Sequence, residues 1–181
     1  MSTVANSPQT HLGAPRTEKA IVDIIRDHPF LRGLRPEYQR LLADCATRMR
    51  YDKDELIFRD GDPANRFYLI EQGHVSLETP AHPQSHPPQS VAMIGPGDVL
   101  GWSWLFPPYC WQFDARTLEP TEAIFFYGSR LREYCEQDHD FGFEMMKRMT
   151  QVIIQRLQAA RRELLANRTP SPAAQAPGQK P

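Results

Sequence analysis

Several features typical of other protein classes are missing from this 181-residue sequence. No apolar run reaches 18 residues, so no segment has the length and hydrophobicity of a membrane-spanning helix. The first residues, MSTVANSPQTHLGAPRTEK, contain no apolar stretch and do not resemble a secretory signal peptide. Neither sign of charge dominates, with 21 Lys and Arg against 22 Asp and Glu. This balance argues against a wholly basic nucleic-acid binder, whose affinity depends on neutralising phosphates.

Cysteine is also scarce, with Cys45, Cys110 and Cys135 spread along the chain. Three distant cysteines give no disulfide framework and too few ligands for an iron–sulfur cluster, so we expect a cytoplasmic protein. No Ser-His-Asp, Cys-His, paired-carboxylate or phosphate-loop constellation is present. His82 and His86 lie among prolines, which prevent the helix that would bring them together on one metal. We therefore predict no catalytic residues, no enzyme activity and no metal site.

Proline, by contrast, is abundant, and its 17 copies are unevenly distributed. Both ends of the chain combine proline with Ala, Gln, Ser and Thr and contain few large apolar groups. Such segments bury too little surface to offset chain entropy, so we predict disordered tails at 1–17 and 168–181. A third proline-rich segment, 80–88, is predicted to be a loop between strands. One domain is then expected at 18–167.

The apolar pattern changes period twice within this domain. Residues 18–28 and the segment opened by Pro36 have helical spacing, and helical spacing returns from Ser129 to about Ala166. Between them lie eight short apolar runs separated by turn residues: Met49–Tyr51, Leu56–Phe58, Arg66–Glu71, His74–Glu78, Val91–Ile94, Val99–Gly101, Phe113–Thr117 and Ala123–Tyr127. This order predicts an α+β fold, an antiparallel, jelly-roll-like β-roll flanked by N-terminal helices and a long C-terminal helix.

Three of the turns contain the glycines Gly61, Gly73 and Gly97, which we assign as structural turn residues. The stretch IFRDGDPANRFYLIEQGHVSLE, followed after a loop by VAMIGPGDVLGW, resembles the cyclic-nucleotide-binding domain of the cAMP receptor protein (Crp/Fnr) superfamily. The resemblance covers about residues 30–165. It implies a β-roll that holds a nucleotide and a long helix that forms a dimer seam.

The segment that binds the nucleotide in this family is altered here. The family places a Gly-Glu pair against the ribose, and an Arg followed by Ser or Thr and Ala against the phosphate. Here Gly101 is kept, but Trp102 stands at the Glu position and Trp111 falls on or near the Arg position. An indole offers one N–H donor and no charge, so it replaces neither group. We therefore expect the fold without ordinary cAMP or cGMP binding and assign no cofactor, with a cyclic nucleotide as the alternative.

The candidate ligand pocket lies at 99–113. The backbone N–H groups of 101–103 and the Ser103 hydroxyl are alternative donors for an anion there. Arg116, which is nearby, either points into the pocket or forms a salt bridge on its strand. The candidate residues are Val99, Leu100, Gly101, Trp102, Ser103, Trp111, Gln112 and Arg116.

Six aromatic residues are concentrated at 102–113: Trp102, Trp104, Phe106, Tyr109, Trp111 and Phe113. Three interpretations remain open. The rings fill the space of an absent nucleotide, they form a pocket for a flat or apolar ligand, or they present a surface to a protein partner.

The C-terminal helix, at about 138–166, has a heptad-like stripe: Met146, Met149, Ile153, Leu157, Ala160 and Leu164. Its first half is expected to pack on the roll. Beyond Ile153 little chain remains to cover the stripe, so we predict a parallel homodimer through this helix. Asn167–Pro181 is too short for the helix-turn-helix of many family members, so we expect no direct DNA binding.

These features predict a non-catalytic regulatory module that senses a small ligand or acts as a signalling and interaction subunit. One alternative is a degenerate domain with a self-filled pocket, serving as accessory subunit of a larger enzyme complex. Another is a fragment of a Crp/Fnr-type transcriptional regulator.

Overall fold

A computed structural model of the chain describes residues 20–79 and 89–168. The tail expected at 1–17 and the loop expected at 80–88 lie outside the described residues. The same holds for the tail expected at 168–181, except that Arg168 is the last residue of the final helix.

The described residues form helices, strands and one short 3-10 helix. In chain order these are α1 (Ile21–Asp27), α2 (Pro36–Asp44), β1 (Thr47–Tyr51), β2 (Leu56–Phe58), β3 (Arg66–Gln72), β4 (Val75–Glu78), β5 (Ser90–Ile94), β6 (Val99–Leu100), η1 (Ser103–Leu105), β7 (Asp114–Thr117), β8 (Thr121–Tyr127), α3 (Gly128–Gln137) and α4 (His139–Arg168).

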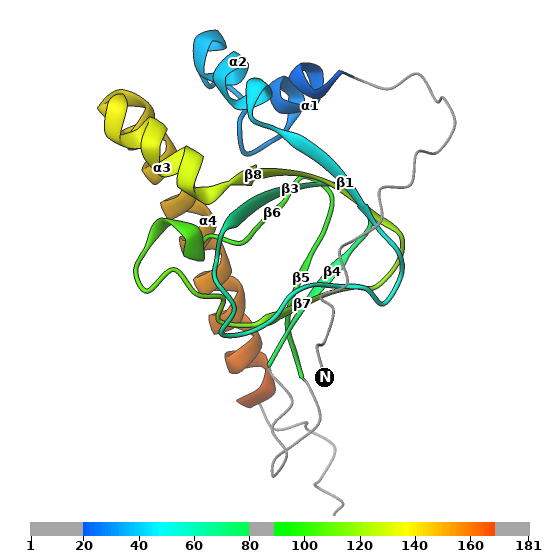
Figure 1. Cartoon of the computed structure of the whole chain (residues 1–181). Coiled ribbons are helices and arrows are strands. Elements are labelled where there is room, and N and C mark those ends of the chain that lie inside the picture. The colour runs from blue at the N-terminus through cyan, green and yellow to red at the C-terminus, as the bar shows by residue number, and fades with distance from the viewer. Residues whose placement is uncertain (1–19, 80–88, 169–181) are drawn as a thin grey trace, which may run out of the picture.

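The strands form two four-stranded antiparallel sheets, in the orders β1-β8-β3-β6 and β2-β7-β4-β5. Each strand overlaps one of the eight predicted runs. Helices α1, α2 and α3 lie at one end of the roll, and α4 runs along its side toward the other end (Figure 1). The structure therefore confirms the predicted antiparallel β-roll between N-terminal helices and a long C-terminal helix.

In the β1-β8-β3-β6 sheet, strands β3, β6 and β8 are buried on both faces, whereas β1 is largely half-buried or exposed. This explains the continuous apolar runs of β3 and β8. Successive strand side chains point to opposite faces. In β3, Phe67 and Leu69 pack against the helices, whereas Tyr68 and Ile70 face the space between the sheets. The molecule therefore has two hydrophobic cores, one between this sheet and the helices and one inside the roll.

The helical pattern expected from 129 to 166 is two helices, and the second, α4, begins within one residue of the start expected for the C-terminal helix, at about 138. The break is at Asp138, whose backbone is extended (φ −130°, ψ 100°). Its carboxylate Oδ1 accepts the backbone N–H groups of Asp140 and Phe141, each at 3.0 Å. The other oxygen, Oδ2, accepts the Tyr38 hydroxyl at 2.9 Å. Asp138 thus caps the start of α4 and attaches it to α2.

Candidate functional site

Six of the eight candidate pocket residues line one small cavity at the end of β6. We call it the Trp111 cavity. Its free volume is about 20 Å³, which is room for about one water, whereas small-molecule sites usually measure about 300–1,000 Å³. It is lined by Phe58, Leu77, Leu100, Gly101, Trp102, Ser103, Trp111, Gln112, Phe113 and Arg156.

The Trp111 indole occupies the centre of this region. It stacks on Phe58 with ring centroids 3.9 Å apart and an interplanar angle of 12°. It is buried in the core inside the roll. Its backbone N–H donates to the Asp62 carbonyl at 2.9 Å, and its carbonyl accepts the Gly61 N–H at 3.0 Å. The side chain is therefore held by packing and its backbone by the turn that follows β2.

Gly101 makes room for this indole. Its φ is +82°, a conformation that L side chains rarely adopt. A Cβ at this position would lie 2.6 Å from Trp111 Cη2 and 2.8 Å from Cζ3. The glycine is therefore required both by its backbone conformation and by the close approach of the tryptophan.

The aromatic cluster is divided among different surroundings. Trp104, in η1, is fully buried in the core between sheet and helices, and its carbonyl accepts the Arg132 guanidinium at 2.6 Å. Trp102 is half-buried at the edge of the Trp111 cavity. Phe106 and Tyr109 are each 38% exposed. Only these last two present much ring surface to a partner protein.

Two candidates lie elsewhere. Val99 faces the helices and lines a larger groove beside α4. Arg116 lies on β7, with its Nε 3.4 Å from Glu78 Oε2 and its Nη1 donating to the Asp54 carbonyl at 3.0 Å. It does not line the Trp111 cavity. Of the two positions considered for this arginine, the structure has the strand salt bridge.

The cation that does line the cavity is Arg156, which sequence reasoning missed as a site residue. It projects from α4, and its guanidinium donates to the Val99 carbonyl. Burial lowers the pKa of Arg156, although an arginine remains charged at neutral pH. No local motif marks this residue, because only the packing of α4 on the roll brings it here.

The turn glycines Gly61, Gly73 and Gly97 all have positive φ, between +79° and +85°. Among the described residues, no group of three or more His, Cys, Asp or Glu side chains is arranged to hold a metal. His74 Nδ1 lies 2.5 Å from Glu119 Oε1, and His82 and His86 are outside the described residues. Within the same part of the chain, no helix combines the length and apolar content needed to cross a membrane.

The heptad-like stripe of α4 needs one correction. Met149 is fully buried in the core of its own roll, so it is not available to a second copy. The outward stripe instead includes Thr150 at that step. We define the α4 stripe as Phe143, Met146, Thr150, Ile153, Leu157, Ala160 and Leu164. Its steps alternate between three and four residues, the spacing of a coiled-coil seam, and Phe143, Leu157 and Leu164 are 66–69% exposed.

Comparisons with known proteins agree with this architecture. The sequence model named "cyclic nucleotide-binding domain" matches residues 48–138. The type II regulatory subunit of cAMP-dependent protein kinase from Drosophila melanogaster is 31% identical over 87 residues. That match covers 48% of this chain and 22% of the relative, so the chain spans about a fifth of the relative's length.

Two solved structures illustrate the range of the fold. The catabolite activator protein of Thermus thermophilus is 25% identical, with a TM-score of 0.59 over 75% of this chain and 61% of that one. The regulatory subunit of a cAMP-independent protein kinase A from Trypanosoma brucei, solved as a triple mutant with cAMP, shares the fold. Its identity is 19% and its TM-score 0.64, over 79% of this chain and 50% of that one. With its two-sheet roll, its glycine turns and a family match over half its length, the chain belongs to the cyclic nucleotide-binding domain family.

Proposed function

We propose that this chain is a non-catalytic regulatory module whose nucleotide position is filled by its own Trp111. The stack of Trp111 on Phe58, which leaves about 20 Å³ free, carries the proposal. A module closed in this way serves as an interaction subunit of a larger assembly, with its roll and α4 held in one arrangement.

The chemistry of the cavity supports this proposal. A cyclic nucleotide needs a charged donor for its phosphate and an acceptor for its ribose hydroxyl. No carboxylate is among the described residues that line the Trp111 cavity, and Ser103 and Gln112 are its uncharged polar side chains. Arg156 supplies the one cation of that lining, but the free volume of about 20 Å³ leaves no room for a phosphate beside it on this side.

The fold itself is compatible with a role that does not depend on cAMP. The Trypanosoma brucei relative is the regulatory subunit of a kinase described as cAMP-independent. The form of that protein solved with cAMP carries three substitutions, one of which introduces an arginine. The same logic suggests how to test the present chain.

The test is a gain of function. Trp102→Glu together with Trp111→Arg removes the stacked indole and supplies a ribose acceptor and a phosphate donor. We expect millimolar cAMP or cGMP to leave the melting temperature of the natural chain unchanged. At a hundred times its dissociation constant, the ligand should stabilise the double variant by about 2.7 kcal/mol and raise its melting temperature by about 5–11 °C.

Trp111→Ala is the matched control, because it empties the cavity without adding a charge. It should be less stable than the natural chain by about 3–5 kcal/mol, as for other buried tryptophans, and should gain no nucleotide affinity. Stabilisation of the natural chain by cAMP as strong as that of the double variant would contradict the proposal.

We also propose that the chain pairs with a second copy through the α4 stripe and that it acts in the cytoplasm. The first part is supported by three large apolar side chains, Phe143, Leu157 and Leu164, that remain two-thirds exposed on one helix. The second is supported by free thiols at all three cysteines, since a reducing compartment keeps thiols unpaired.

A further inference from the structure

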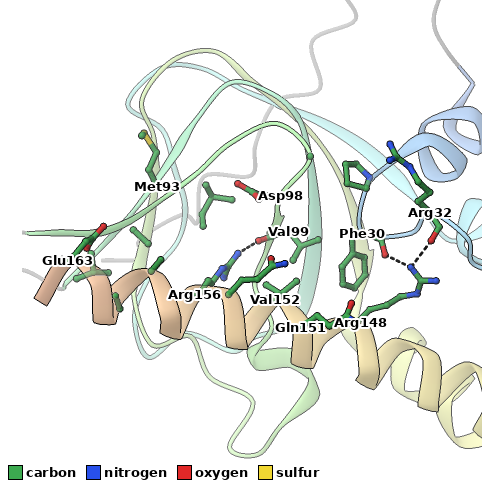
Figure 2. A pocket seen from close by; sticks show the side chains of 18 residues that line it. Phe30, Arg32, Met93, Asp98, Val99, Arg148, Gln151, Val152, Arg156 and Glu163 are labelled. Carbon is green, nitrogen blue, oxygen red and sulfur yellow. Dashed lines mark hydrogen bonds between the residues drawn. The ribbon is translucent and has the colours of Figure 1, made fainter. Parts of the chain in front are cut away.

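A second and much larger cavity lies on the other side of Arg156. We call it the α4 groove. It runs between α4, the strands β5 and β6 with their connecting turn, and the Pro29–Arg32 segment that follows α1 (Figure 2). Its volume is about 700 Å³, within the usual range of small-molecule sites. This groove, and not the Trp111 cavity, has the size of a ligand site.

The α4 groove has an apolar wall and a cation near its middle. Figure 2 shows Arg156 rising from α4 toward the roll, with Val99 and Val152 beside it and Met93 farther along. At one end, Arg148 is already engaged, since its Nη1 donates to the carbonyls of Phe30 at 2.7 Å and Arg32 at 3.0 Å. The groove therefore combines apolar side chains with polar ones, including the carboxylates of Asp98 and Glu163, and Arg156 is the guanidinium near its middle.

The charge of Arg156 is incompletely compensated. No carboxylate of residues 20–79 and 89–168 lies within ion-pair distance of it. Asp98 is near enough to act on it electrostatically, but Asp98 Oδ2 accepts the Gly95 N–H at 2.9 Å. A partly buried guanidinium with one carbonyl partner keeps N–H groups available, and a carboxylate or phosphate binds such groups strongly.

We propose that the α4 groove binds an amphipathic anion, a carboxylate or phosphate on an apolar body. Its head pairs with Arg156, and its body lies along Val99, Val152 and Met93. This site does not depend on whether Trp111 excludes nucleotides. It also has a route to the roll, because Arg156 holds the Val99 carbonyl and Val99 precedes the Leu100–Gly101 contact with Trp111.

The experiment uses the full chain and the probe 8-anilinonaphthalene-1-sulfonate, an anion on an aromatic body. N-phenyl-1-naphthylamine, which has nearly the same body and no charge, is its neutral counterpart. Calorimetric titration should show one saturable site per chain for the anionic probe, displaced by decanoate and not by decanol. The neutral probe should bind at least about tenfold more weakly, as expected when a charge-assisted bond is lost.

Two variants locate the site. Arg156→Gln should weaken the anionic probe at least about tenfold, whereas Arg161→Gln, an exposed arginine of α4 outside the groove lining, should change its affinity less than about twofold. Because Arg156→Gln also loses the bond to Val99, its thermal unfolding is measured alongside. Ala159→Phe fills the groove while keeping Arg156 and should abolish binding, and Gln158→Phe, outside the lining, should not.

Three results would overturn the proposal. The first is no saturable binding, and the second is equal affinity for the charged and neutral probes. The third is affinity unaffected by both Arg156→Gln and Ala159→Phe.

Sedimentation velocity at the same concentrations measures whether the chain associates. Loss of probe binding as the chain associates would mean that a second copy occupies the groove. None of these outcomes bears on nucleotide binding, which is tested through the tryptophan variants.

Discussion

Among single residues, Gly101 and Trp111 depend on each other most directly. A Cβ on residue 101 would lie only 2.6 Å from the indole atom Cη2, which is too close for two carbon atoms. Gly101 thus makes room for a tryptophan of the same chain. A substitution at either residue should therefore alter the packing of the other.

Gly101→Ala should lower the free energy of unfolding by about 2–5 kcal/mol, because it adds left-handed backbone strain to a steric clash. Chemical denaturation measures this loss. Gly61→Ala is a matched control, since Gly61 has φ +79° but nothing within 4 Å of an added Cβ. Gly61→Ala should lower the free energy of unfolding only through left-handed backbone strain, by about 1–2 kcal/mol.

A double-mutant cycle separates the two contributions. In a Trp111→Leu background the clash is removed, so Gly101→Ala should cost about as much as Gly61→Ala does. Equal costs of Gly101→Ala in both backgrounds would show that the indole does not occupy the position described.

The sequence could predict this site only in part. Trp102 and Trp111 are predicted as pocket residues because they lie in the segment that follows the third glycine turn, and both line the Trp111 cavity. Arg156 is not anticipated, because it lies 45 residues beyond Trp111 in the sequence and reaches the cavity only when α4 packs on the roll. Phe58, the partner of the indole, is likewise an ordinary strand residue until β2 and residue 111 meet.

At the scale of elements, α4 presents three faces. One face, with Phe141, Met145 and Met149, is buried in its own core. A second lines the α4 groove through residues that include Val152 and Arg156. The third is the α4 stripe, and Ala160 belongs to both the stripe and the groove. The helix is therefore the element through which pairing and groove binding would influence each other.

Leu157→Glu should disrupt the proposed homodimer. A carboxylate at the centre of the α4 stripe would be buried without a partner, which costs about 2–5 kcal/mol. This corresponds to a dimer dissociation constant raised at least about thirtyfold, measured by sedimentation equilibrium. Gln158→Glu introduces the same charge at the next residue, which is exposed and lies outside the α4 stripe. It should leave the dimer dissociation constant within about twofold of the natural value. A natural chain that sediments as a monomer at all concentrations would contradict the pairing.

The elements differ in how well the sequence specifies them. The strands are predicted because short apolar runs bounded by glycine, aspartate and proline turns are typical of antiparallel strands. The start of α4 is predicted to within one residue, at about 138. The end of α3 is not, because apolar spacing continues from Ser129 and only the extended backbone of Asp138 divides the two helices. The spacing also places Met149 in the pairing stripe, although it belongs to the half of the helix that is expected to pack on the roll and is buried there. Spacing alone does not show which side of a helix its own roll covers.

For the molecule as a whole, His28 lies where the N-terminal helices join the roll. It ends α1, and its Nδ1 accepts the Phe30 N–H at 3.3 Å. It is 5% exposed, and burial lowers its pKa from 6.5 to about 4, with the backbone of Ile70 and the charge of Asp98 offsetting only part of the effect. The folded protein therefore holds this imidazole neutral where the unfolded chain would protonate it.

This difference predicts a loss of stability in mild acid. Between pH 6.5 and about 4 the unfolded chain binds a proton at His28 that the folded chain does not. The free energy of unfolding should therefore fall with pH through this range, by about 3 kcal/mol in total from this group. Urea unfolding between pH 7 and pH 4 measures how the free energy of unfolding depends on pH. His28→Gln should remove the part of that dependence that comes from His28. His139→Gln, at an exposed histidine, is the matched substitution away from this junction. A His28→Gln profile parallel to the natural one would mean that the junction opens to admit a charged imidazole, and that α1 is not held against the roll as described.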